Sequence, residues 1–136
     1  MISWLDKSQL EIANQKSQIA MILCAVDDLM FATKISTAAK ALQREIAFER
    51  NAERVLTRVR EERPSLVIFD LNSSKLRPLD AIRAIKADPD LTATRTLGYV
   101  SHVQADVIAA ARRAGCDEVL ARSAFSLRLG EILQDG

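Results

Sequence analysis

Three aspartates stand directly after stretches of apolar residues, and their spacing is the chemically informative feature of this sequence. Asp27 and Asp28 follow the run IAMILCAV at 19–26, and Asp70 ends the run SLVIFD at 65–70. A run that is apolar throughout, without polar alternation, is typical of a strand buried on both faces. If the two strands are parallel, their carboxyl ends meet at one edge of a sheet and the three carboxylates converge there.

A cluster of carboxylates needs a counter-ion. Like charges raise one another's pKa unless a cation lies between them. Mg²⁺ suits such a site because it takes oxygen ligands, keeps several waters and bridges to phosphate. The three aspartates therefore indicate phosphoryl chemistry at a magnesium site. The alternative is chance, because strands often end in polar residues.

The apolar runs alternate with amphipathic stretches from residue 19 onward. We expect strands at 19–26, 45–48, 65–70, 96–101 and 117–122, and helices at 29–43, 51–62, 79–87, 107–115 and 125–133. Pro78 suits the first turn of a helix, and Gly115 is a typical helix stop. Gly98, inside the fourth strand, indicates a bulge or a close backbone approach. Helices that cross between buried strands predict an α/β fold with a five-stranded, doubly wound parallel sheet.

Length and composition predict one domain. The chain has 136 residues, of which 49% are hydrophobic and 4% aromatic. This is enough for one aliphatic core, which we assign to residues 19–136. Residues 1–18 are polar with a weak apolar stripe, so we expect a short N-terminal extension that is loosely held or helical.

Charge and targeting signals narrow the choice of partners and compartment. The net charge of +1 argues against direct nucleic-acid binding. The chain has no apolar run of membrane-spanning length and no signal-peptide core, so we expect a soluble cytoplasmic protein with no membrane association. Cys24 and Cys116 lie far apart and are most simply small buried hydrophobic residues.

The order of these motifs resembles the receiver domains of two-component response regulators, which have the flavodoxin-like (βα)5 fold. The resemblance covers about residues 19–134 and rests on ILCAVDD at 22–28, LVIFDLN at 66–72 and AGCDEVLAR at 114–122. It implies a stand-alone domain that receives a phosphoryl group from a sensor histidine kinase or a phosphotransfer protein. Such a domain is not an enzyme, although its phosphotransfer and dephosphorylation are self-catalysed, and its output passes to a protein partner in trans.

The resemblance also implies roles for individual residues. Asp70 matches the phosphoacceptor, a nucleophilic carboxylate that forms an aspartyl phosphate. Asp27 and Asp28 match the acidic pair that holds Mg²⁺, together with Asp70 and the main-chain carbonyl of Asn72. Ser101 resembles the hydroxyl residue that contacts the phosphoryl group.

Several positions depart from the family's pattern. Arg122 stands where the family has lysine, and its guanidinium is expected either to reach the phosphoryl group or to pair with Asp70. Ser123 replaces a proline that is usually cis, and Val119 replaces an aromatic switch residue. Pro78 stands where glycine is usual, and proline cannot take a positive φ.

These departures leave a second interpretation open. The chain is then a pseudo-receiver, a protein-interaction or homodimerisation module without phosphoryl chemistry. A nucleotide- or flavin-binding protein of the same fold is disfavoured, because DDLMFATK follows the first strand instead of a glycine-rich phosphate loop.

Overall fold

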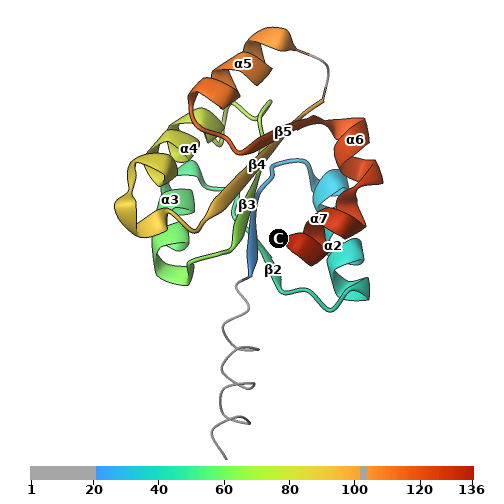
Figure 1. The fold of residues 1–136 in the computed structure, drawn as a ribbon. Coiled ribbons are helices and arrows are strands. Elements are labelled where there is room, and N and C mark those ends of the chain that lie inside the picture. The colour runs from blue at the N-terminus through green and yellow to red at the C-terminus, as the bar shows by residue number, and fades with distance from the viewer. Residues whose placement is uncertain (1–20, 102–103) are drawn as a thin grey trace, which may run out of the picture.

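The strands of this chain form one parallel sheet covered by helices on both faces (Figure 1). The computed structural model describes residues 21–101 and 104–136, so the expected extension at 1–18 lies outside the described residues. The strands are β1 Ile22–Ala25, β2 Ile46–Phe48, β3 Leu66–Asp70, β4 Arg95–Val100 and β5 Glu118–Ala121. Their order is β2-β1-β3-β4-β5, and each neighbouring pair is parallel. The expected fold is confirmed.

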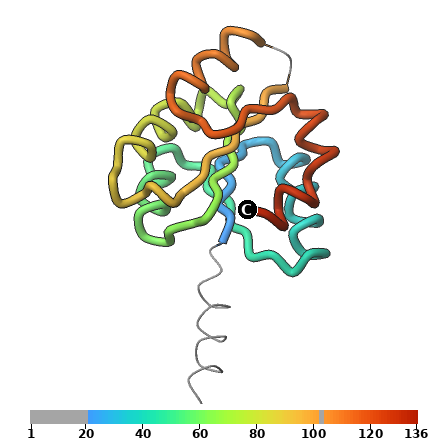
Figure 2. The backbone as a smooth tube through the Cα atoms, in the orientation of Figure 1, coloured from blue at the N-terminus to red at the C-terminus, as the bar shows by residue number. Residues whose placement is uncertain are grey.

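The helices divide between the two faces of the sheet, as the backbone trace in Figure 2 also shows. They are α2 Leu29–Ala41, α3 Ala52–Glu62, α4 Pro78–Ala87, α5 Ala105–Arg113, α6 Arg122–Leu127 and α7 Leu129–Asp135, with a 3₁₀ turn at Pro89–Leu91. Helices α3, α4 and α5 pack on one face, and α2, α6 and α7 on the other. The single helix predicted at 125–133 is wrong, because the chain has a turn at Arg128 and Leu127 is exposed.

Each strand contributes side chains alternately to two hydrophobic clusters. Leu23, Val67 and Phe69 join the cluster under α3, α4 and α5, whereas Ile22 and Ile68 join the cluster under α2, α6 and α7. Successive side chains of a strand point to opposite faces. Because both faces are covered, the strands need apolar residues at every position, which explains the continuous runs in the sequence.

Local signals set the helix boundaries near the site. The Asp28 carboxylate caps the N-terminus of α2 by accepting a hydrogen bond from the Phe31 N–H. Pro78 occupies the first turn of α4, as expected, and the positive φ of this loop falls on Arg77 instead, at 45°. Gly115 follows α5 with a φ of 100°, in the left-handed region that glycine favours.

Gly98 marks a close approach, one of the two alternatives raised by its place inside a strand. A Cβ atom at this position would lie 2.6 Å from the Cδ1 atom of Leu71. The Leu71 side chain therefore packs directly on the backbone of β4. The Leu71 N–H also donates to the carbonyl of Tyr99 at 3.0 Å, which fixes the chain immediately after Asp70.

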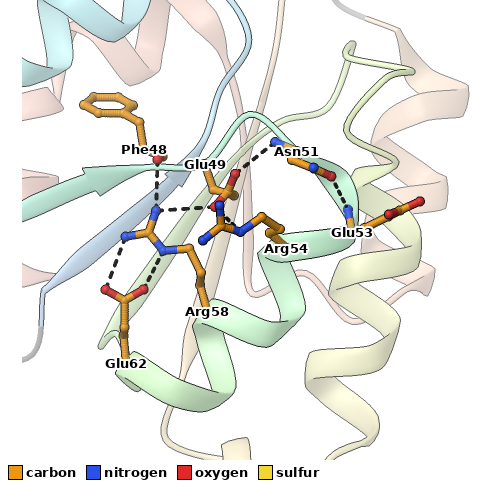
Figure 3. Close-up of polar contacts among 7 residues, drawn as sticks. All are labelled: Phe48, Glu49, Asn51, Glu53, Arg54, Arg58 and Glu62. Carbon is orange, nitrogen blue, oxygen red and sulfur yellow. Dashed lines mark hydrogen bonds and ion pairs between the residues drawn. The ribbon is translucent and has the colours of Figure 1, made fainter.

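A polar network joins the end of the edge strand β2 to α3 (Figure 3). Arg58 donates to the Phe48 carbonyl at 3.0 Å and makes a two-pronged ion pair with Glu62. The Glu49 side chain, buried beside it, lies 3.5 Å from the Arg58 guanidinium and accepts a hydrogen bond from the Asn51 N–H. The network thereby anchors a strand that, in the described part of the chain, pairs with β1 alone.

Candidate functional site

The carboxyl ends of β1 and β3 lie side by side, and the chain leaves both strands into one pocket. Ala25 is the register partner of Phe69, so the residues that follow the two strands emerge together. The pocket has a volume of about 340 Å³ and is lined by Asp27, Asp28, Asp70, Asn72, Ser73, Ser74 and Lys75. The structure thus brings together the three aspartates and Asn72, as expected from their positions after parallel strands.

Asp70 is the half-buried carboxylate of the pocket. Burial raises its pKa, and the neighbouring Asp28 and Asp27 act in the same direction, while the Asn72 N–H and Arg122 oppose the shift. The Asn72 N–H donates to Oδ1 at 3.0 Å. The Oδ2 atom has no hydrogen-bond partner among the described residues, so one oxygen is free to act as a nucleophile.

Asp28 has both carboxylate oxygens engaged. Oδ1 accepts from the Phe31 N–H at 3.1 Å, and Oδ2 accepts from Arg122 at 2.7 Å. The hydrogen bond from Phe31 is the largest influence that lowers the pKa of Asp28, and the Arg122 pair adds to it. The expectation that Arg122 pairs with Asp70 is therefore wrong, because α6 begins at Arg122 and its guanidinium points to Asp28 instead.

Asp27 is paired with two basic side chains that the sequence reasoning missed. The Arg50 guanidinium lies 3.3 Å from Oδ1 of Asp27, and Nζ of Lys75 lies 3.9 Å from the same atom. Arg50 follows β2 and Lys75 lies in the segment between β3 and α4. The signal in the sequence was a basic residue in each of two segments that leave the sheet at the same edge as the aspartates.

The Asn72 side chain connects the ends of β3 and β4. The Asn72 amide donates to Gln104 at 2.5 Å, and its Oδ1 accepts from the Ser101 N–H at 2.6 Å. Ser101 is exposed and lines a neighbouring pocket of about 470 Å³, which Arg122 also lines. Ser101 and Arg122 thus lie outside the set of residues that lines the acidic pocket, and the Asp28–Arg122 ion pair joins the two pockets.

The donor set fits a hard divalent cation by its chemistry. Three carboxylates line the pocket, and carboxylate oxygens are ligands that Mg²⁺ takes. Within residues 21–101 and 104–136, however, no three His, Cys, Asp or Glu side chains are grouped closely enough to hold a metal ion. Basic partners hold Asp27 and Asp28 in this arrangement, so a cation must compete with them.

An open parallel sheet in this strand order, with a pocket at the carboxyl ends of its central strands, defines a flavodoxin-like α/β protein. Solved structures narrow the fold further. The phosphorylated cyanobacterial phytochrome response regulator RcpA is similar over 85% of this chain and 89% of its own, with 21% identity and a TM-score of 0.71.

Two further solved structures of response regulators have a similar fold. A response regulator from Hahella chejuensis matches with 17% identity over 85% of this chain and 92% of its own, with a TM-score of 0.76. The chemotaxis response regulator CheY4 of Vibrio cholerae matches with 15% identity over 87% and 98% of the two chains, with a TM-score of 0.74. No family model and no curated protein matches the chain. The three solved structures show that the chain has the receiver-domain fold of two-component response regulators.

Among the residues that the structure describes, no helix is long and apolar enough to span a bilayer.

Proposed function

We propose that this chain is a signalling receiver domain that accepts a phosphoryl group on Asp70. The observation that carries the proposal is the pocket in which Asp70 lies beside Asp27 and Asp28 at the carboxyl ends of two central parallel strands. Ligands of doubly wound sheets bind at this edge. The likeness to RcpA, a response regulator solved in its phosphorylated form, gives further support.

The chemistry proposed for Asp70 is nucleophilic. The free Oδ2 atom attacks the phosphorus of a phosphohistidine or of a small acyl phosphate, while the Asn72 N–H holds Oδ1 in place. A phosphorus–oxygen bond to Asp70 forms, and the bond to the donor's nitrogen or oxygen breaks with its electron pair. Lys75 is 64% exposed and only loosely paired at 3.9 Å, so its ammonium is available to approach the phosphoryl oxygens.

We assign the metal ligands to Asp27, Asp28, Asp70 and the carbonyl of Asn72. Bound Mg²⁺ would supply positive charge for the phosphoryl oxygens in the transition state. The response regulator Rcp1, whose Mn²⁺-bound form has been solved, has the same fold, with 17% identity over 83% of this chain and 91% of its own and a TM-score of 0.71. Ser101 and Arg122, from the neighbouring pocket, complete the proposed set of residues near the phosphoryl group.

The partners follow from this assignment. The phosphoryl donor is a sensor histidine kinase or a phosphotransfer protein, and the output passes to another protein in trans. The domain itself turns over no separate substrate, and its phosphorylation and dephosphorylation are self-catalysed. We place it in the cytoplasm, where such kinases present their phosphohistidine.

A phosphorylation-independent interaction module is the second candidate, and two observations favour it. Basic side chains already neutralise the acidic pair without a metal ion. At the start of α2, Leu29 and Met30 are 63% and 84% exposed, and Leu127 at the end of α6 is 89% exposed. Exposed large apolar side chains suit a protein-binding or dimerisation surface.

One experiment separates the two candidates. The protein is incubated with Mg²⁺ and beryllofluoride or acetyl phosphate, and amide NMR shifts are followed in the wild type and in Asp70→Asn. Asp80→Asn is the matched control, because Asp80 is an exposed carboxylate on α4 whose one ion-pair partner among the described residues is Arg83.

We expect shifts around residues 27, 28 and 70 in the wild type and in the Asp80→Asn control, and none in Asp70→Asn. Equal responses from wild type and Asp70→Asn would exclude Asp70 as the phosphoacceptor. The interaction module would then be the better description of the chain.

A further inference from the structure

Basic side chains offset the negative charge of the acidic pocket. Asp27 is paired with Arg50 and Lys75, and Asp28 is paired with Arg122, whose charge also acts on Asp70. Three carboxylates of the pocket thus have three basic side chains near them, of which Lys75 also lines the pocket. A dication that enters this pocket adds to a neutral cluster unless one of the basic groups leaves.

Arg122 is the best held of these basic groups. Its nitrogen lies 2.7 Å from Oδ2 of Asp28, and its guanidinium carbon lies 4.3 Å from the centroid of the Phe31 ring. A guanidinium so close to an aromatic face gains a cation–π attraction. The Phe31 ring in turn packs on Tyr99 and Phe125, at centroid distances of 4.8 and 5.5 Å. The arginine therefore rests on a fixed aromatic surface.

The two partners of Asp27 are held more loosely. Arg50 lies 3.3 Å from the carboxylate with a side chain 51% exposed, and Lys75 lies 3.9 Å away with a side chain 64% exposed. Exposed pairs at these distances are screened by solvent and contribute little. By contrast, the Arg122 side chain is 35% exposed and also has the contact with Phe31.

We propose that Arg122 competes with the divalent cation for Asp28, so that the Asp28–Arg122 ion pair weakens the binding of the metal. The inference rests on the metal site of the proposed function. A guanidinium that stays hydrogen-bonded to Oδ2 of Asp28 draws negative charge away from the carboxylate that would ligate the metal. The two positive charges also repel each other at this short separation. Arg122 thereby sets the concentration of cation at which the pocket fills.

Metal affinity tests the proposal directly. Free Mn²⁺ is followed by electron paramagnetic resonance during titration of the wild type, Arg122→Gln and Arg50→Gln, and Mg²⁺ is measured by displacement. We expect Arg122→Gln to bind Mn²⁺ about tenfold more tightly than the wild type, since one partly buried competing ion pair has been removed. Arg50→Gln removes the same charge from the other aspartate of the acidic pair but breaks a looser ion pair, so the gain in Mn²⁺ affinity should be about twofold.

Two further variants separate the effect of this ion pair from the loss of any positive charge and from unfolding of the variant. Arg128→Gln changes an arginine that pairs with Glu118 and Glu131, away from the pocket, and should bind like the wild type. Arg122→Lys keeps the charge but loses the planar contact with Phe31, and we expect an intermediate affinity. Amide spectra establish whether each variant is folded. If Arg122→Gln does not fold, the Mn²⁺ affinity of Arg122→Lys tests the competition in its place.

The outcomes are distinct from those of the phosphorylation experiment. Unchanged affinity in folded Arg122→Gln, or an equal gain in Arg50→Gln, overturns the competition. Absence of Mn²⁺ binding in every protein at millimolar ion overturns both the competition and the proposed metal site. Tighter binding by Arg122→Gln supports the competition even if Asp70 proves unreactive, because the titration contains no phosphoryl donor.

Discussion

Replacing Gly98 with alanine tests the close packing between β4 and the segment that follows Asp70. The added Cβ would lie 2.6, 2.7 and 2.8 Å from the Cδ1, Cγ and Cδ2 atoms of Leu71, all inside normal contact distance. Because Cγ is among the close atoms, rotation of the two methyl groups about the Cβ–Cγ bond does not relieve the contact, and the Leu71 side chain must move as a whole. Overpacking of this kind costs about 1–3 kcal/mol, while alanine lowers the entropy of the unfolded chain by about 0.4–1 kcal/mol. We expect a net loss of about 1–2 kcal/mol.

Urea denaturation at neutral pH measures this loss, and Gly130→Ala is the matched control. Gly130 lies in α7, and a Cβ there would meet nothing within 4 Å. The same chemical change should therefore stabilise the protein by about 0.5–1 kcal/mol. If Gly98→Ala proves as stable as Gly130→Ala, the packing argument is wrong, because the two variants share the unfolded-state effect.

Three further predictions concern stability, each measured by chemical denaturation. Tyr99→Phe should raise the free energy of unfolding by about 1 kcal/mol, because the buried hydroxyl has no hydrogen-bond partner among the described residues; a loss would reveal one. For Asp117, burial works to raise the pKa but hydrogen bonds, first that from Lys86, lower it overall, so the carboxylate stabilises the fold at neutral pH. Asp117→Asn should thus destabilise at pH 7, and the loss should shrink as the pH falls below the ordinary aspartate pKa of about 3.9; a pH-independent loss would contradict this. Arg58→Met should cost about 1–3 kcal/mol, because the Phe48 carbonyl loses its donor, and an unchanged midpoint would show that the network contributes nothing.

Much of the fold could be predicted because the sheet is buried on both faces. A doubly covered strand needs apolar residues without interruption, and the runs at 65–70 and 96–101 became β3 and β4 with shifts of one residue. The turn at Arg128 escaped prediction, because the apolar spacing on either side of it continues as in a single helix. Only the packing shows that Leu127 is left in solvent.

The sequence predicted which acidic residues line the pocket but not which basic residues pair with them. Parallel strands must end at one edge, so Asp28 and Asp70 were bound to meet. Which of them Arg122 would contact depends on where α6 begins and on the ring of Phe31, and neither follows from the order of residues. Lys75 contacts Asp27 from the segment between β3 and α4, and the path of that segment does not follow from the order of residues.

The aromatic group beneath the ion pair gives this chain a reporter of its own. Tyr99 is the only tyrosine in the sequence. Its ring stacks on Phe125 at 5.1 Å with an interplanar angle of 9° and also contacts Phe31, the ring beneath the Arg122 guanidinium. Biosynthetic incorporation of fluorotyrosine would give one ¹⁹F resonance, and ring currents from both neighbours would set its position. Release of the arginine at the surface would thus be visible from inside the core, as a single line in a spectrum.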